Sequence, residues 1–324
     1  MKYRLLGKTG VKVSQLCFGT MSFGGDADEA TSAAMFKRCR DAGINFFDTA
    51  NVYSGGRSEE ILGRLMKGSR DELIITSKVF GAVGSDVNAR GLSRRHITRA
   101  VEDSLRRLNT DRLDLYFVHQ HDYNTPIEET VGVLDDLVQQ GKIVYPAVSN
   151  WSAWQTAKAL GIAERKNQAR FECMQPMYSL AKRQAEVELL PLAQSEQIGV
   201  IPYSPLGGGL LTGKYTTANR PAKGRLVENQ MYIKRYQEEL FYEVAERFTN
   251  YAQEKNMHPA TLAVAWVMAH PAVTAPIIGA RNLEQLESSL AAVDVEMTPE
   301  WRAEMSAISP EPPPATDRSE EQKG

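Results

Sequence analysis

The sequence predicts an α/β fold of the (β/α)8 or TIM-barrel class, and two observations support this prediction. Short runs of four or five β-branched and aromatic residues, such as Leu115-Tyr116-Phe117-Val118, are each followed by polar loops, which is typical of buried parallel strands. Strand and helix patterns then alternate eight times within 324 residues. Eight such units in a chain of this length favour a closed barrel over an open doubly wound sheet.

The first five units follow one another closely. Their strands are expected at residues 15–20, 44–47, 73–77, 115–118 and 144–148, and their helices at 29–41, 59–65, 93–109, 126–140 and 153–164. The third and fourth helices each place their apolar residues on one face: Ile97, Val101, Leu105 and Leu108, then Ile127, Val131, Leu134 and Val138. Thr125 and Glu128 predict a capping box for the fourth helix, with Pro126 in its first position. In the fifth strand, Pro146 lacks a ladder donor, which predicts a late start or a bulge.

Three further units complete the barrel. Their strands are expected at 171–174, 199–203 and 273–278, and their helices at 181–195, 259–269 and 282–292. Alternating residues at 3–7 and 11–13 predict an extra hairpin that plugs the barrel floor. Residues 216–230 are expected to form a flap over a bound ligand at the barrel edge. One barrel domain is expected over 1–308, with a disordered, proline-rich and charged tail over 309–324.

Composition narrows the class of protein. With 42% hydrophobic and 24% charged residues, the chain resembles an ordinary soluble globular protein. A net charge of -2 predicts no nucleic-acid partner. The start lacks an apolar signal segment, and the longest apolar stretch, 262–269, is too short to span a bilayer, so we expect no membrane partner and a cytoplasmic location. Three cysteines, Cys17, Cys39 and Cys173, are an odd number, which favours buried free thiols over a disulfide framework.

Four polar residues lie at or just past strand ends: Asp48, Tyr53, Lys78 and His119. In parallel α/β folds this edge carries the chemistry, so the four form a candidate proton-transfer site. A phenol with a pKa of about 10 is a poor acid at neutral pH. An ammonium beside it favours phenolate, and a buried carboxylate keeps that ammonium charged and restrains its position. The alternative interpretation is a structural ion pair of Asp48 and Lys78 with Tyr53 packed in a loop.

The sequence contains partial patterns of two other kinds of site, a metal centre and a nucleotide-binding loop. His119-Gln120-His121-Asp122 is similar to the paired histidines of metal-dependent hydrolase barrels, but the remaining histidines, His96, His258 and His270, fall on expected helices or at their ends, so we expect no metal. Gly208 to Lys214 fits the P-loop spacing, yet Tyr215 stands where magnesium binding needs Ser or Thr. No dinucleotide-binding G-x-G-x-x-G is present.

Several motifs occur together in a characteristic order. They are Phe47-Asp48-Thr49-Ala50-Asn51-Val52-Tyr53, Thr76-Ser77-Lys78, Val118-His119, Val148-Ser149-Asn150 and Tyr203-Ser204-Pro205-Leu206. With these motifs the chain resembles the aldo-keto reductase superfamily from about Arg4 to Ala292. It is most similar to the branch of bacterial reductases and potassium-channel β subunits, which share the stretch from Ser204-Pro205-Leu206 to Gly213-Lys214-Tyr215.

The resemblance implies a reductase that passes a hydride from NADPH to a small aldehyde or ketone. Tyr53 would be the acid, tuned by Lys78 and Asp48, and His119 would order the carbonyl. Ser149, Asn150 and Gln175 would hold the nicotinamide carboxamide, and Tyr203 would stack on its ring. The pyrophosphate would be lined by Ser204, Leu206, Gly207, Gly208 and Lys214. Gly279 and Arg281 would take the 2'-phosphate, and Gln285 would lie near the adenine. The remaining cofactor contacts that it implies are Thr20, Met21, Asp48, Pro205 and Arg225.

The chain departs from the family pattern at one place, and one alternative to the reductase function stays open. Ser288-Ser289 stands where relatives often carry Glu-Asn, which weakens the expected adenine contacts, although Arg281 still argues for NADPH. The rival from another class is a cofactor-binding regulatory subunit like the channel β subunits, which tend to lack the histidine found here as His119. Strand-end loops set specificity in such barrels, so the sequence singles out neither a carbonyl substrate nor an oligomeric state.

Overall fold

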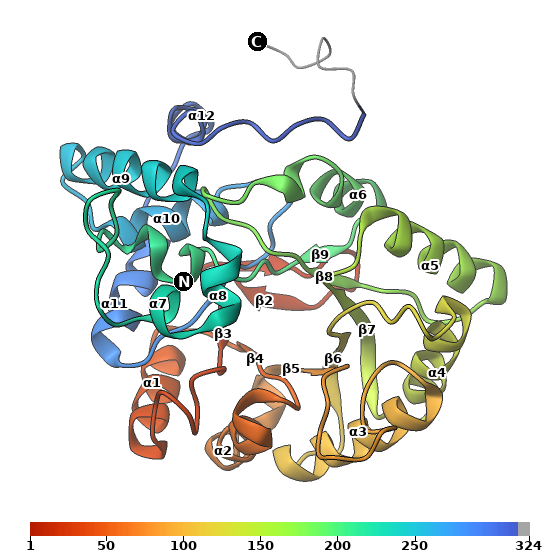
Figure 1. Ribbon diagram of the computed structural model, residues 1–324. Coiled ribbons are helices and arrows are strands. Elements are labelled where there is room, and N and C mark those ends of the chain that lie inside the picture. The colour runs from red at the N-terminus through yellow and green to blue at the C-terminus, as the bar shows by residue number, and fades with distance from the viewer. Residues whose placement is uncertain (317–324) are drawn as a thin grey trace.

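Eight parallel strands form a barrel in the computed structural model, which describes residues 1–316 (Figure 1). Neighbouring strands pair in the order β10-β3-β4-β5-β6-β7-β8-β9. The ring closes because the Ile277 N–H donates to the Pro202 carbonyl at 2.9 Å and the Thr274 N–H to the Val200 carbonyl at 2.8 Å. The predicted fold class is therefore confirmed. The strands are β3 (Cys17–Gly19), β4 (Phe46–Asp48), β5 (Ile74–Val79), β6 (Leu113–Val118), β7 (Ile143–Ser149), β8 (Cys173–Gln175), β9 (Gly199–Val200) and β10 (Ile277–Ile278).

Helices surround this ring (Figure 1). The α-helices are α1 (Glu29–Asp41), α2 (Arg57–Leu65), α3 (Arg94–Leu108), α4 (Ile127–Gln139), α5 (Ala153–Lys166), α6 (Leu189–Glu196), α7 (Arg225–Glu228), α8 (Gln230–Arg235), α9 (Glu239–Glu254), α10 (Pro259–Met268), α11 (Leu283–Leu290) and α12 (Pro299–Ser306). Short 3-10 helices are η1 (Tyr53–Gly56), η2 (Arg70–Glu72), η3 (Gln184–Glu186), η4 (Gly207–Thr212) and η5 (Ala291–Asp294).

The core has an inner and an outer layer. Successive side chains of β6 alternate between them: Leu115 and Phe117 pack inside the barrel, whereas Tyr116 and Val118 pack against the helices. The strands β1 (Tyr3–Leu5) and β2 (Lys12–Ser14) form the predicted antiparallel hairpin, and the flanking Leu6 packs within the inner layer. All three cysteines are buried and unpaired, as predicted. No helix in residues 1–316 is long and apolar enough to cross a membrane.

Three local predictions were wrong. The capping box at Thr125 does not form, because its hydroxyl donates to Asp122 and α4 begins without a side-chain cap. The helix expected at 181–195 is divided into η3 and α6, and Pro191 lies in the first turn of α6, where its missing N–H is tolerated. β7 runs unbroken through Pro146, because its pairing to β8 starts one residue later, at Ala147.

Four α-helices were not expected. They are α7 and α8, in and just after the segment expected as a flap, α9, between that segment and α10, and α12, which precedes the proline-rich residues. Of the tail expected over 309–324, residues 317–324 lie outside the described residues. Within the described part of the tail, the Ser309 carbonyl accepts from the Arg183 guanidinium at 3.4 Å.

Candidate active site

The Lys78 ammonium lies at the centre of a buried polar cluster at the C-terminal ends of β4 and β5. Its Nζ donates to Asp48 Oδ2 at 2.5 Å, to the Thr49 carbonyl at 2.7 Å and to the Tyr53 hydroxyl at 3.3 Å. The Lys78 side chain is 0% exposed and that of Asp48 is 3% exposed. The structure thus brings together the carboxylate, ammonium and phenol that the sequence predicted to meet.

The three groups perturb one another in opposite directions. Burial alone would lower the pKa of Lys78, but Asp48 and Tyr53 together raise that pKa above its ordinary value. Burial raises the pKa of Tyr53, while the Lys78 ammonium pulls it down only in part. The sequence-based expectation of a phenol made more acidic than usual is therefore wrong in its net direction. Tyr53 instead stays fully protonated at neutral pH, which is the form that a proton donor needs.

His119 lies next to the ring of Tyr53. It follows β6, and its ring lies edge-on to that of Tyr53 with 6.1 Å between centroids. Burial, helped by the positive charge of Lys78, lowers the pKa of His119 to about 3. The imidazole is therefore neutral at physiological pH and can donate one hydrogen bond to an uncharged oxygen without bringing a positive charge.

Asp48 is held by neighbours on both sides. The Thr76 hydroxyl and the Gln175 amide both donate to Asp48 Oδ1, at 2.7 and 2.9 Å. At the adjacent strand ends, the Ser149 hydroxyl donates to the Gln175 carbonyl at 2.9 Å. Thr20 is buried and its backbone N–H donates to the Asp48 carbonyl at 2.8 Å. These contacts form one polar network that connects the C-terminal ends of β3, β4, β5, β7 and β8.

Asn150 connects His119 to an aromatic ring. Its Nδ2 donates to the His119 carbonyl at 2.9 Å, and its Oδ1 accepts from the Tyr203 hydroxyl at 2.7 Å. Asn150 has φ +56°, the left-handed conformation that Asn tolerates better than most residues. Ser149, Asn150, Gln175 and Tyr203 therefore lie together, as predicted for a group that binds a planar ring.

The segment after β9 turns sharply through glycines. Ser204, Gly207 and Gly208 all have positive φ, and a Cβ added at Gly208 would lie 2.7 Å from the Tyr232 ring. The segment of α7 and α8 covers this turn. The Arg225 and Arg235 guanidinium groups lie 5.7 and 5.4 Å from the centre of the Tyr232 ring. The covering segment thus reaches Arg235, beyond the flap expected at 216–230. Tyr232 and Arg235 were not among the predicted residues, because no periodic pattern marks them.

The segment after β10 carries the expected phosphate ligands. Arg281 Nε lies 3.2 Å and Arg225 Nη2 lies 3.8 Å from the same carboxylate oxygen, Asp26 Oδ2. The Gln285 side chain accepts from the Arg281 backbone N–H at 3.1 Å. Gly279 is exposed, and a Cβ added there would lie 3.7 Å from the Gly19 carbonyl oxygen, an ordinary van der Waals contact. Arg225 and Arg281 therefore converge, although the flap and the last βα loop are distant in sequence.

The other residues predicted to contact the cofactor differ in how exposed they are. Met21, at the end of β3, is 39% exposed, and Lys214 is exposed on the turn after η4. Pro205 is buried and Leu206 is half-buried in the turn that leads into η4. Of the pair that departs from the family pattern, the Ser288 carbonyl accepts from the Thr261 hydroxyl at 2.6 Å and the Ser289 side chain is 1% exposed. Both serines thus contribute to helix packing.

His121 does not join His119. Its ring packs against Trp151 with 4.9 Å between centroids, and Trp151 packs on Phe171 in the outer layer. Among residues 1–316, no group of three or more His, Cys, Asp or Glu side chains could hold a metal ion. Trp151, 4% exposed, therefore contributes packing.

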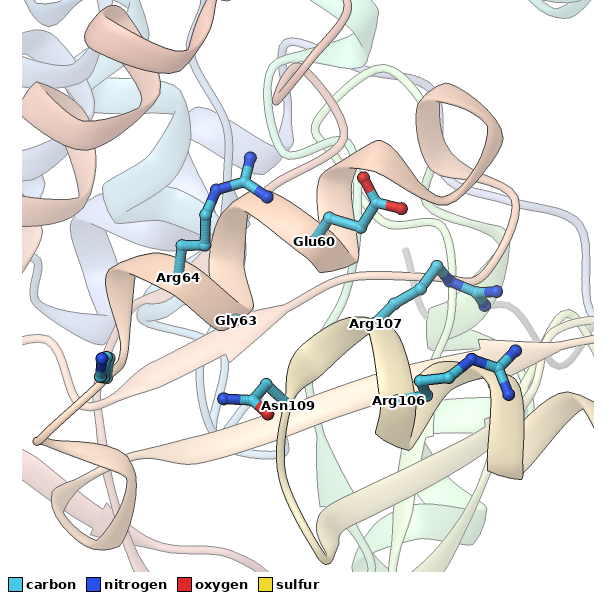
Figure 2. Close-up of a pocket in the computed structure, with 7 residues that line it drawn as sticks. Glu60, Gly63, Arg64, Arg106, Arg107 and Asn109 are labelled. Carbon is cyan, nitrogen blue, oxygen red and sulfur yellow. The ribbon is translucent and has the colours of Figure 1, made fainter.

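A surface pocket of about 430 Å³ lies away from these groups, between α2 and α3 (Figure 2). Arg64 and Glu60 line it from α2, and Arg106 and Arg107 line it from α3. Arg64 is paired with Glu29 at 2.8 Å and Arg107 with Glu59 at 2.7 Å. Because acidic partners already neutralise these arginines, the pocket offers little net charge for a ligand.

Comparisons with known proteins agree with this arrangement. The family profile described as Aldo/keto reductase family matches residues 15–310. An uncharacterized oxidoreductase, YrpG, of Bacillus subtilis is 38% identical, covering 96% of this chain and 97% of its own length. A probable voltage-gated potassium channel subunit beta of Oryza sativa is 36% identical, covering 98% and 99%. A protein of Arabidopsis thaliana with the same name is 38% identical, covering 91% and 92%. On this evidence the chain belongs to the aldo/keto reductase family.

Proposed function

We propose that the protein is an NADPH-dependent reductase that converts a small aldehyde or ketone to an alcohol, with Tyr53 as general acid. The observation that carries the proposal is the Lys78 ammonium, 0% exposed and held between the Asp48 carboxylate and the Tyr53 hydroxyl. A buried ion pair alone would need no phenol at its open side. Here the phenol completes a donor set that faces the C-terminal end of the barrel, where such folds place their chemistry.

The residues around this centre fit a dinucleotide. Gly207 and Gly208 carry no side chains, so a pyrophosphate could approach the backbone of this turn closely, at the place where the Tyr232 ring now lies against Gly208. Arg225 and Arg281 provide two guanidinium groups for a phosphate dianion. Asn150 and Gln175 offer amide groups, and Tyr203 offers a flat face for a nicotinamide ring. When bound, NADPH supplies the hydride.

The chain's own groups would then manage the proton and the carbonyl oxygen. The neutral His119 imidazole donates a hydrogen bond that orients this oxygen and polarises its double bond. The Tyr53 hydroxyl gives its proton to the same oxygen as negative charge develops there. The Lys78 ammonium stabilises the phenolate that remains, and Asp48 keeps Lys78 charged and in place.

A turnover assay tests the proposal. Purified protein is mixed with NADPH and a panel of activated aldehydes, ketones and sugars, and cofactor oxidation is followed together with the alcohol product. We expect many turnovers per protein molecule on at least one activated aldehyde. NADPH binding without turnover on any panel member would contradict a reductase.

The second candidate is a cofactor-binding regulatory subunit. Relatives from rice, Arabidopsis and Schizosaccharomyces pombe carry names of voltage-gated potassium channel beta subunits, and the last is 34% identical. This candidate predicts tight cofactor binding with at most a single turnover. The complete set of Asp48, Tyr53, Lys78 and His119 favours the reductase, because a binding module has no use for an ordered proton donor.

A further inference from the structure

Asp26 places a carboxylate between the two arginines that would bind the 2'-phosphate. Its Oδ2 lies 3.2 Å from Arg281 Nε and 3.8 Å from Arg225 Nη2. The Asp26 side chain is 51% exposed, against 38% for Arg281 and 28% for Arg225. The carboxylate therefore lies on the open side of the pair, where an incoming anion would arrive.

The position of Asp26 is built into the fold. The preceding Ser22 is 4% exposed, and its hydroxyl donates at 2.7 Å to the carbonyl of Ala280, the residue before Arg281. The turn from Ser22 to Ala27, which contains Asp26, is closed by the Ala27 N–H, which donates to the Ser22 carbonyl at 2.9 Å. The loop after β3 and the loop after β10 thus fix the position of the Asp26 carboxylate relative to the Arg281 guanidinium. This contact does not depend on the conformation of the flap.

Electrostatics decides what this carboxylate does when a cofactor binds. A 2'-phosphate carries close to two negative charges and needs the guanidinium groups that Asp26 occupies. It must displace the carboxylate and then remain near it, so attraction to the arginines is offset by repulsion from Asp26. The free 2'-hydroxyl of NADH carries no charge and is nearly indifferent to Asp26.

We propose that Asp26 is a specificity-determining residue that weakens the preference of this site for NADPH over NADH by competing with the 2'-phosphate for Arg281 and Arg225. The inference rests on the proposed cofactor site and goes beyond it, because it assigns to an acidic residue an effect opposite to that of the arginines. Cofactor choice is then set by a balance of three charged side chains from three loops.

Equilibrium binding tests the inference without a substrate. Affinities for NADPH and NADH are measured by calorimetric titration of the full chain and of Asp26→Asn, which keeps the size of the side chain. Because exposed ion pairs are weak, we expect NADPH to bind about three- to tenfold more tightly to the variant and NADH to change by less than about twofold. The gain should shrink at high salt, since these groups are open to solvent.

Two further variants serve as controls. Glu284→Gln removes a negative charge on α11 that forms no ion pair within residues 1–316, and it should leave both affinities unchanged. Arg281→Ala with Asp26→Asn should show little of the gain, because the freed guanidinium is gone. Unchanged or weaker NADPH binding in Asp26→Asn, or equal changes for both cofactors, would overturn the inference. If the unmodified protein bound neither cofactor, the proposed function itself would fail, which is a separate result.

Discussion

At the scale of single residues, the site depends on how burial and charge oppose each other. Burial raises the pKa of Tyr53 and would lower that of Lys78, but the Asp48 carboxylate keeps the lysine charged. The result is a protonated phenol beside a permanent cation. In the proposed reaction, such a pair would release its proton only when negative charge develops nearby, and this would link the proton transfer to the reduction of the carbonyl group.

Removing the phenolic oxygen tests this role. We expect Tyr53→Phe to keep NADPH affinity and to lower kcat by at least about a hundredfold, because the ring remains and the proton donor is lost. Steady-state kinetics and a binding titration on the same preparation check it. Turnover near that of the unmodified protein would remove Tyr53 from the mechanism.

The arginine that faces Asp26 supports a second prediction. Arg281→Ala should weaken NADPH binding roughly ten- to a hundredfold, because a charge-assisted contact contributes about 1.5 to 3 kcal/mol, and it should barely affect NADH. Calorimetry with both cofactors measures the difference. Equal losses for the two would assign Arg281 to some part of the molecule other than the phosphate.

At the scale of secondary-structure elements, a buried ion pair joins α2 and α3 close to the candidate active site. Glu59 is 0% exposed; it accepts from the Ser77 hydroxyl at 2.5 Å and from Arg107 at 2.7 Å. Ser77 is the neighbour of Lys78 on β5. The side chain of Arg107 lies against Gly56, where an added Cβ would stand 2.9 Å from its Cδ, at the end of the short helix that begins with Tyr53.

Breaking that pair should destabilise the barrel. We expect Glu59→Ala to lower the free energy of unfolding by about 3 to 5 kcal/mol, because it leaves Arg107 unpaired in a largely buried site. Urea denaturation measures this change. As a control, Asp41→Ala removes an exposed partner of Lys37 and should change stability by less than about 1 kcal/mol. Similar small losses in both variants would show that Glu59 is dispensable.

At the scale of the whole molecule, histidines make the fold sensitive to mild acid. Burial lowers the pKa of His119 to about 3 and, aided by Arg302, that of His270 to about 4. As pH falls below about 6.5, the unfolded chain gains protons that the native protein does not bind, so the free energy of unfolding decreases.

This sign leads to a prediction for stability. Between pH 7 and about 5, above the range in which most carboxylates titrate, each of these histidines should steepen the fall by up to about 1.4 kcal/mol per pH unit. Thermal or urea unfolding across this range measures it. His270→Asn should flatten the profile, whereas a stability independent of pH between 5 and 6.5 would contradict the lowered pKa values.

The sequence predicted those parts of the molecule that are encoded locally. Asp48, Lys78 and His119 each lie at or just past the end of an apolar run, so they could be placed at one barrel edge before any contact was known. Tyr232 and Asp26 could not be placed, because their roles arise only when the flap and two distant loops converge. The capping box at Thr125 failed for a similar reason: Asp122 competes for its hydroxyl.

One junction of the barrel ring, between β9 and β10, differs from the others. Thr274, Ala275 and Ile277 donate backbone hydrogen bonds across it, yet no regular strand ladder forms there. The loops that follow these two strands carry Gly207, Gly208 and Arg281. A cofactor bound to both loops would therefore span the junction and hold the two strands together. Amide hydrogen exchange should therefore slow at Thr274, Ala275 and Ile277 when NADPH is added, and far less in β6, whose strand is paired on both sides. Binding of the cofactor would in this way also reduce how often the barrel opens between β9 and β10.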